Sequence, residues 1–239
     1  MKILPTSLDG PFLFRIASFV VYHFFLIPLT FIIWFCVYGM RIRGRKNLRG
    51  HHKGFIAANH CLYVEVGFTA FATWPKKVLY GSERINVTRK DFGWIARLLR
   101  TFILSSNNIM ATAVFIKKAL KKNWFVLFYP ERSLNWRCQT PGPFFDGVFF
   151  FAFVNNVPVF PIVEVLHERL IRKVLPWWPP RTTLVIGAPF YPDDFRKPGL
   201  SKREQIHLMS QAVRGFMTTT IAEEGGCTTL PESRQTPLP

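Results

Sequence analysis

The sequence predicts an α/β fold, a mixed sheet flanked by helices, with an N-terminal membrane-anchoring helical segment. Two observations carry this prediction. Short apolar runs alternate with longer helical patterns along most of the chain, as in domains whose helices cover a sheet. Before the first of these runs, the segment from Ile16 to Tyr38 is almost entirely apolar. It is long enough for one membrane span, which takes about 20 residues.

The composition favours a membrane-associated protein. The 239 residues suffice for one large domain with an appendage, and 49% of them are hydrophobic. The 31 Lys and Arg residues exceed the 14 Asp and Glu residues, which gives a net charge of +17. This balance suits an anionic cytoplasmic leaflet. Nucleic acid is the alternative partner, but no nucleic-acid-binding motif is present. The four cysteines show no zinc spacing, so we expect no metal and no bound cofactor.

We expect residues 1–40 to form the membrane anchor. Pro28 interrupts the apolar segment, which is therefore either one kinked span or two short helices that enter one leaflet and return. A buried core helix is the remaining alternative. Basic residues are more frequent after the segment than before it, at Arg41, Arg43, Arg45, Lys46, Arg49 and Lys53 against Lys2 and Arg15. This asymmetry predicts a membrane protein whose following domain lies on the cytoplasmic side.

Residues 41–222 are expected to form the α/β domain, and residues 223–239 a disordered tail. The expected strands are Phe55–Ala58, Val78–Tyr80, Phe102–Leu104, Trp124–Tyr129, Val159–Val165 and Thr182–Ile186. The expected helices are Leu62–Thr73, Trp94–Leu99, Ala111–Lys121, Gly147–Asn155 and Ser201–Ile221. Ser201 and Glu204 have the spacing of a capping box, which predicts the start of the last helix. In such a sheet, ligands bind near the carboxyl ends of strands.

The turn after the first expected strand carries a histidine and a carboxylate. His60 follows Phe55–Ala58, and Glu65 lies five residues further on. On one continuous helix the two side chains would be about 140° apart, so they meet only if His60 lies in the turn and Glu65 reaches back. Such a pair is a general base, because the carboxylate fixes the imidazole tautomer and favours the imidazolium. The alternative is a surface histidine and a solvated glutamate. We expect Cys61 to pack rather than react.

A second candidate segment follows the strand Trp124–Tyr129, which Pro130 ends. The loop lies at the same sheet edge as His60 and contains Glu131, Arg132, Ser133 and Arg137. Its arginines are suited to holding a phosphate through paired hydrogen bonds, and Glu131 to accepting from a polyol hydroxyl. The alternative is an ion pair within the loop.

Four segments, in order and in spacing, resemble motifs of the glycerolipid acyltransferase family, typified by 1-acylglycerol-3-phosphate acyltransferase. Asn59-His60 with Glu65 is similar to the N-H-x-x-x-x-D block, and Phe128–Glu131 to the start of the F-P-E-G-T-R-S block. Phe145–Gly147 and Val157–Ile162 resemble the turn and the V-P-V-x-P-V strand that follow. The resemblance covers about residues 41 to 222.

The resemblance implies an O-acyltransferase of phospholipid biosynthesis. Such an enzyme moves a fatty acyl group from a thioester of coenzyme A or acyl carrier protein to a hydroxyl of a lysophospholipid. It further implies that His60 is the base and Glu65 its orienting partner, with no acyl-enzyme nucleophile and no metal. The implied partners are membrane lipids, the lysophospholipid and the acyl donor.

The sequence departs from the family pattern in three places. Glu65 replaces the usual aspartate, so its backbone must retreat by about 1 Å. Leu134 stands where the second block has its arginine, and Phe102–Ser105 contains no arginine where a further block is expected, although Arg97 and Arg100 lie upstream. We therefore expect Arg132 or Arg137 to hold the phosphate of the acceptor. The alternatives are a lipid-binding relative with altered catalysis and an acyltransferase with a non-phosphate acceptor.

Overall fold

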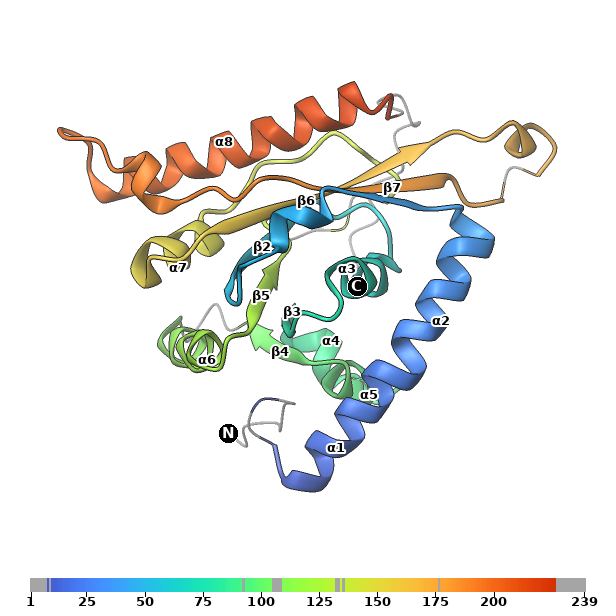
Figure 1. Cartoon of the computed structure of the whole chain (residues 1–239), viewed down its shortest axis with the longest axis horizontal. Coiled ribbons are helices and arrows are strands. Elements are labelled where there is room, and N and C mark those ends of the chain that lie inside the picture. The colour runs from blue at the N-terminus through green and yellow to red at the C-terminus, as the bar shows by residue number, and fades with distance from the viewer. Residues whose placement is uncertain are drawn as a thin grey trace.

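A seven-stranded mixed sheet forms the centre of the protein, with helices on both of its faces (Figure 1). The computed structural model describes residues 8, 10–91, 93–104, 109–131, 134, 136–175 and 177–226. The strands are β1 Arg41–Arg43, β2 Gly54–Ala58, β3 Val78–Glu83, β4 Thr101–Leu104, β5 Phe125–Phe128, β6 Val159–His167 and β7 Arg181–Ile186. Their order in the sheet is β1-β7-β6-β2-β5-β3-β4.

Strand β2 lies at the middle of the sheet, between β5 and β6, and is parallel to both. The sheet is mixed because β6 and β7 are antiparallel, whereas the remaining neighbours are parallel. The last residue of β2, Ala58, pairs with Ile162 of β6, and β6 continues to His167. The turn that follows β2 is therefore flanked on one side by a strand that extends beyond it.

Apolar side chains of β2 alternate between the two faces of the sheet. Phe55 and Ala57 pack in one core cluster, with residues of the helices α6 Ile109–Lys121, α7 Gly147–Asn155 and α8 Lys202–Glu223. Ile56 and Ala58 pack in a second cluster, with α3 Glu65–Thr73 and the N-terminal helix. Both faces are covered, which explains why the strand reads as a continuous apolar run rather than as an alternating one.

The N-terminal apolar segment forms one long helix, Phe12–Tyr38 (Figure 1). It consists of α1 Phe12–Val20, η1 Val21–Leu26, α2 Ile27–Ile32 and η2 Ile33–Tyr38, of which η1 and η2 are π-helical turns. Its length and composition are those of a candidate membrane anchor. Pro28 does not divide it into two helices, so of the two alternatives left open by the sequence the single helix is found. The helix ends at Gly39, whose φ of 52° is left-handed.

Six of the seven strands and all five expected helices are present, with boundaries that differ by at most three residues. The expected capping box is confirmed, since Ser201 N–H donates to Glu204 Oε2 at 2.7 Å and Glu204 N–H donates to Ser201 Oγ at 3.3 Å. The elements that were not expected are β1, the helix α4 Arg84–Thr88 and the 3₁₀ turns η3 Arg45–Leu48, η4 Leu170–Lys173 and η5 Pro192–Phe195. The helix expected at Trp94–Leu99 is α5 Gly93–Leu98. Of the expected disordered tail, Glu223 belongs to α8, and residues 227–239 lie outside the described residues.

Candidate active site

The turn between β2 and α3 brings His60 and Glu65 into contact. Strand β2 ends at Ala58 and α3 begins at Glu65, so His60 lies in the turn and Glu65 in the first helical turn. His60 Nδ1 forms a hydrogen bond with Glu65 Oε1. The side chain of His60 is 22% exposed and that of Glu65 only 2% exposed. The pair therefore has a buried carboxylate and an imidazole that solvent can reach.

The second carboxylate oxygen of Glu65 binds the backbone of the same turn. Oε2 accepts hydrogen bonds from Cys61 N–H at 2.9 Å and from Leu62 N–H at 3.0 Å. These donors fix the carboxylate, so its other oxygen is directed at Nδ1 of the imidazole. Nε2 is then the ring nitrogen that remains for a substrate.

Glu131 holds the same turn from the side of β5. Its Oε1 accepts from His60 N–H at 3.1 Å, and its Oε2 accepts from Gly142 N–H at 2.9 Å. The residue is only 7% exposed. Arg214 of α8 fixes the far end of this loop, since its Nε donates to Gly142 O at 2.8 Å. From the sequence we expected Glu131 to accept from a substrate hydroxyl, and this stays a prediction. In the structure each of its oxygens accepts from a backbone N–H group.

Two further contacts position the imidazole. The ring of His60 stacks on that of Tyr129, with centroids 4.4 Å apart and an interplanar angle of 21°. Asn59 binds β6 through its side chain, whose Nδ2 donates to Glu164 O at 3.0 Å and whose Oδ1 accepts from Glu164 N–H at 2.7 Å. The amide of Asn59 thus continues the backbone pairing beyond the end of β2.

Arg137 reaches this turn, as expected from its place in the sequence. Its backbone N–H donates to Cys61 O at 2.8 Å, and its guanidinium lies 4.4 Å from the ring centroid of Trp136. Its φ of 58° is left-handed, so the local backbone is strained to make this approach. Arg132 and Ser133, the other expected substrate-binding residues, lie outside the described residues.

Arg100, upstream of the family's arginine block, serves a different part of the structure. It precedes the amino end of β4, whereas His60 follows the carboxyl end of the parallel strand β2. Its guanidinium lies 3.7 Å from the ring centroid of Tyr22, and its Nη2 is 2.9 Å from His23 Nε2. Arg100 is only 5% exposed. It therefore fastens the N-terminal helix to the domain and does not supply a cation beside His60.

Burial shifts the pKa values of both His60 and Glu65. It lowers the pKa of His60 to about 4, against the negative charge of Glu131. It raises the pKa of Glu65 to about 8, against the hydrogen bonds from Leu62 and Cys61. Because one hydrogen bond joins Nδ1 to Oε1, the two groups take up a proton as a pair. In the unprotonated pair Nδ1–H donates to the carboxylate, and Nε2 keeps a free lone pair that is able to accept a proton.

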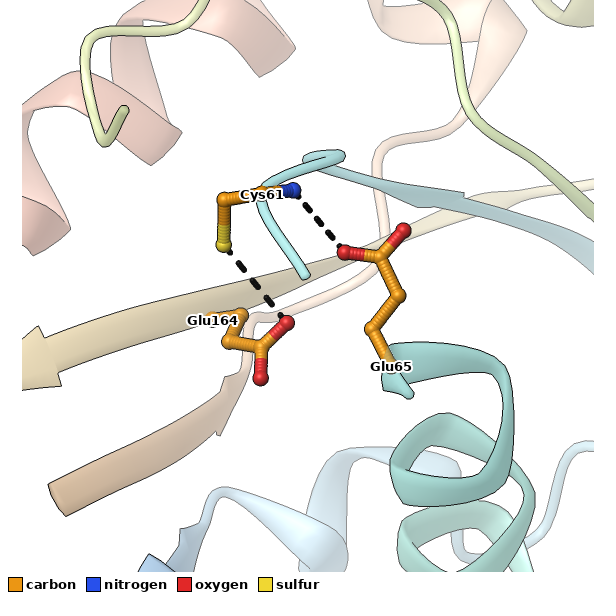
Figure 2. A group of neighbouring side chains, drawn as sticks. All are labelled: Cys61, Glu65 and Glu164. Carbon is orange, nitrogen blue, oxygen red and sulfur yellow. Dashed lines mark hydrogen bonds between the residues drawn. The ribbon is translucent and has the colours of Figure 1, made fainter. Parts of the chain in front are cut away.

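A third buried acidic residue, Glu164, faces Cys61 and Glu65 (Figure 2). One oxygen of each carboxyl and the sulfur of Cys61 all lie within 4.8 Å of one another. Such a group satisfies the spacing of a metal site, which was not expected from the sequence. Metal binding requires a thiolate and carboxylates. Burial raises the pKa values of the Cys61 thiol and of Glu164 well above their ordinary values, so these two groups hold protons when no ion is bound. Glu164 is the one charged residue in the apolar run Val157–Leu166, a signal that could have marked it in the sequence.

Comparison with known proteins identifies the family and the fold. The sequence profile of the acyltransferase family matches residues 39–165, more than half of the chain. The crystal structure of the 1-acyl-sn-glycerophosphate acyltransferase PlsC from Thermotoga maritima has the same fold, with a TM-score of 0.58 over 91% of this chain and 97% of that chain. The two sequences are 13% identical. No curated protein sequence matches significantly. The matched segment contains the His60 turn, the Glu131 loop and most of β6, and the chain belongs to the acyltransferase family.

Proposed function

We propose that this acyltransferase moves a fatty acyl group from an acyl thioester, on coenzyme A or acyl carrier protein, to a hydroxyl of a lysophospholipid such as 1-acylglycerol-3-phosphate. The observation that carries the proposal is the His60 imidazole, bound through Nδ1 to a buried carboxylate at the carboxyl end of β2. The family supports acyl transfer. The activity named for the Thermotoga maritima protein, which shares the fold, supports the choice of acceptor.

In the proposed reaction, His60 Nε2 takes the proton of the acceptor hydroxyl while its oxygen attacks the thioester carbonyl carbon. The tetrahedral intermediate then collapses, the carbon–sulfur bond breaks, and the leaving thiolate receives the proton from the imidazolium. Glu65 stabilises the imidazolium between these two steps. A thioester is already activated, so a positioned base and two bound substrates suffice without an acyl-enzyme. General-base catalysis of this kind contributes about 10²- to 10⁴-fold.

Three backbone N–H groups of the turn next to the base are already hydrogen-bonded and so do not form an oxyanion hole. The N–H groups of His60, Cys61 and Leu62 all donate to buried carboxylates. They are therefore committed to holding the turn. We assign the anionic part of the acceptor to Arg137, whose backbone is hydrogen-bonded to this turn, together with Arg132 and Ser133 of the same loop. A guanidinium suits a phosphate because it donates two parallel hydrogen bonds.

We place the enzyme on a membrane through the N-terminal helix. One face of the helix packs on the domain, where Ser18 Oγ donates to Leu98 O at 2.6 Å and the hydroxyls of Tyr22 and Tyr80 are 3.1 Å apart. The opposite face exposes large apolar side chains, among them Phe12, Leu13, Phe24, Phe25, Leu29 and Phe35. A helix attached to the domain along one face is suited to lie within one leaflet rather than to cross it alone.

The connection between β6 and β7 supports the same placement. Leu170, Val174 and Trp177 are 81%, 80% and 68% exposed. Arg169, next to them, donates from Nη1 to Val37 O at 3.0 Å, so this connection adjoins the end of the N-terminal helix. Tryptophan favours the head-group level of a bilayer, which fits an exposed Trp177. The basic residues after the helix favour the cytoplasmic leaflet.

Purified protein in phospholipid vesicles tests the proposal. Thiol release from acyl-coenzyme A and from acyl carrier protein is followed with a panel of acceptors: 1-acylglycerol-3-phosphate, lysophosphatidylcholine, lysophosphatidylglycerol and monoacylglycerol. Acyl transfer to at least one lysophospholipid that disappears in the His60→Ala variant is the expected result. If folded protein transfers no acyl group with either donor to any acceptor, the chain is a lipid-binding relative with altered catalysis.

A further inference from the structure

Glu164 occupies a position that the proposed reaction leaves unexplained. It lies on β6 two residues beyond Ile162, the partner of the last residue of β2. The strand therefore places Glu164 beside the turn that carries His60, and the Asn59 side chain binds the backbone of Glu164 on both its N–H and its carbonyl. The residue is 2% exposed. A carboxyl group is thus held in the core beside the turn that carries the base.

The surroundings of Glu164 do not suit a negative charge. Its Oε2 accepts a weak hydrogen bond from Cys61 Sγ at 3.6 Å, and its Oε1 has no hydrogen-bond partner among the described residues. Within the same residues Glu164 forms no ion pair. An ionised carboxylate taken out of water without a cation or strong donors is very unfavourable.

The carboxyl groups of Glu65 and Glu164 face each other, as Figure 2 shows. Two buried carboxyls at this separation do not both ionise near neutral pH, because like charges repel strongly in the interior. Glu65 has two backbone N–H donors and the imidazole, whereas Glu164 has one thiol. The ionised member is therefore Glu65, and Glu164 carries the proton. Burial and the charge of Glu65, which raise the pKa of Glu164, agree with this assignment.

We propose that Glu164 is a positioning residue, a neutral carboxylic acid that directs its hydroxyl to the Glu65 carboxylate and so keeps Glu65 ionised. A hydrogen bond donated to a carboxylate favours its charged form. The ionised Glu65 accepts from Nδ1–H of His60 and leaves Nε2 free, which the proposed reaction requires. Without this donor, the pKa of Glu65 would rise, and Glu65 would stay protonated at higher pH. The protonated carboxyl would donate a hydrogen bond to Nδ1, and the neutral imidazole would then carry its hydrogen on Nε2.

Other titratable groups around Glu164 have to be included in any reading of pH dependence. The groups that interact with its charge are Cys61 of the turn, Tyr129, which directly follows β5, and Tyr38 of η2. Arg137 in turn interacts with Tyr38. Two further titratable groups interact with the neighbours of Glu164, since His60 is hydrogen-bonded to Glu65 and the charge of Glu131 acts on Cys61. On β7 the residue paired with Glu164 is Leu184, which is apolar. Among the described residues, Glu65 is therefore the carboxylate acceptor that faces Glu164 directly.

The first test is the pH dependence of kcat/KM in two variants of nearly the same shape. Glu164→Gln retains a donor but cannot ionise, and Glu164→Met has neither property. With a neutral Glu164, Gln should leave the acidic limb of the profile in place. Glu164→Met should move the acidic limb upward by about one to two pH units, as expected for a lost hydrogen bond to a charged group. At pH values below the limb this shift is a ten- to hundredfold loss of kcat/KM. Glu168→Met, the same change at an exposed residue just beyond β6, is the control.

If instead both Glu164 variants move the limb to lower pH, Glu164 is ionised in the wild type and the proposal is wrong. It is equally wrong if Glu164→Met folds and leaves the limb unchanged. If Glu164→Met does not fold, Glu164→Gln alone still decides. A shift of its acidic limb to lower pH refutes the proposal, and an unchanged limb supports it. A stoichiometric metal ion in the purified wild type that Glu164→Gln loses would show that an ion, not a proton, joins the carboxyls.

The catalytic consequence rests on the proposed function, so a second measurement is independent of activity. The ¹⁵N chemical shifts of the His60 ring, assigned by comparison with His60→Gln, report which nitrogen carries hydrogen. Wild type and Glu164→Gln should show hydrogen on Nδ1 above the titration of the pair, and Glu164→Met should move toward the Nε2–H tautomer. If these shifts behave as expected in a protein without acyl transfer, the proposed function fails and the role of Glu164 stands. An unchanged tautomer in folded Glu164→Met refutes that role.

Discussion

Replacement of Glu65 by glutamine should disable the base while leaving the turn intact. The N–H groups of Cys61 and Leu62 both require an acceptor, so the amide oxygen of the new side chain should take the position of Oε2. The amide nitrogen then faces His60 Nδ1 and donates to it. A neutral imidazole that accepts at Nδ1 carries its hydrogen on Nε2, where the proton of the acceptor hydroxyl has to be received.

The expected magnitude follows from what is lost. Glu65→Gln removes both the correct tautomer and the charge that stabilises the imidazolium, so kcat should fall by the contribution of the base, about 10²- to 10⁴-fold. Glu65→Asp keeps the charge but shortens the side chain by one methylene. The shorter carboxylate then reaches either His60 or the backbone donors but not both, and a displacement of about 1 Å lowers the rate on the order of 100-fold. The predicted order of activity is wild type, then Asp, then Gln.

Initial rates of thiol release, with saturating donor and varied lysophospholipid, give kcat and KM for each variant. Glu223→Gln, the same change at an exposed residue at the end of α8, is the matched control and should keep the wild-type rate. Thermal unfolding should show that Glu65→Gln is folded, because its size and its backbone contacts are retained. Equal kcat values for folded Glu65→Gln and wild type would refute the view that the pair works as a unit.

Four further outcomes are expected. His60→Ala should lose acyl transfer almost completely but keep the wild-type circular dichroism spectrum, and retention of most of the rate would remove His60 from the reaction. In pH-rate measurements kcat/KM should rise with pH through the raised pKa of the pair, near the value of about 8 for Glu65. The reason is that protonation of the pair blocks Nε2 of His60. A profile of kcat/KM that is flat between pH 6 and 9 contradicts this. Acceptor titrations of Arg137→Ala should give a roughly tenfold or higher KM for a phosphate-bearing lysolipid and unchanged values for the thioester and for a neutral monoacylglycerol; equal losses with both acceptors exclude a phosphate contact. Folding stabilises the protonated form of Glu164, whose contribution is complete below the unfolded pKa and is lost as pH rises toward the folded one. As pH rises above the unfolded pKa, the free energy of unfolding should therefore fall by about 1.4 kcal/mol per pH unit more in wild type than in Glu164→Gln, as denaturant titrations would show.

The elements that the sequence predicted are those whose burial is continuous along the chain. Strands such as β2 and β5 are covered on both faces, so their apolar runs were visible without knowledge of their neighbours. Strand β1 was missed because Arg41-Ile42-Arg43 has one apolar residue, and its strand conformation depends on pairing with β7, about 140 residues further along. Helix α4 was missed because its five residues are too few to show a helical period.

The contacts of the candidate site were likewise predictable only where they depend on residues close together in the sequence. The contact of His60 with Glu65 was predictable, because the two residues are only five positions apart. They cannot meet on one continuous helix, so contact requires His60 in the turn and Glu65 at the start of the helix. The partners of Glu131 were not predictable, since they depend on the side-by-side packing of β2 and β5 and on the path of the loop to Gly142. Glu164 is 103 residues from Cys61, and their contact exists because β6 is inserted next to β2. Sequence spacing carries no information about that neighbour.

Three buried carboxyls lie around the turn that carries His60, and their different partners explain why the arrangement is tolerated. Glu131 binds two backbone N–H groups on separate segments, and Glu65 binds two more together with the ring. Glu164 lacks such donors and is the group best suited to remain uncharged. The longer side chain of Glu65, in place of the aspartate that the family motif has, reaches back from α3 to both the turn and the imidazole, and its carboxylate also faces β6. On the proposal that a neutral Glu164 donates to this deeply buried carboxylate, positions 65 and 164 are coupled, and Glu65→Asp should make the activity less sensitive to the loss of Glu164.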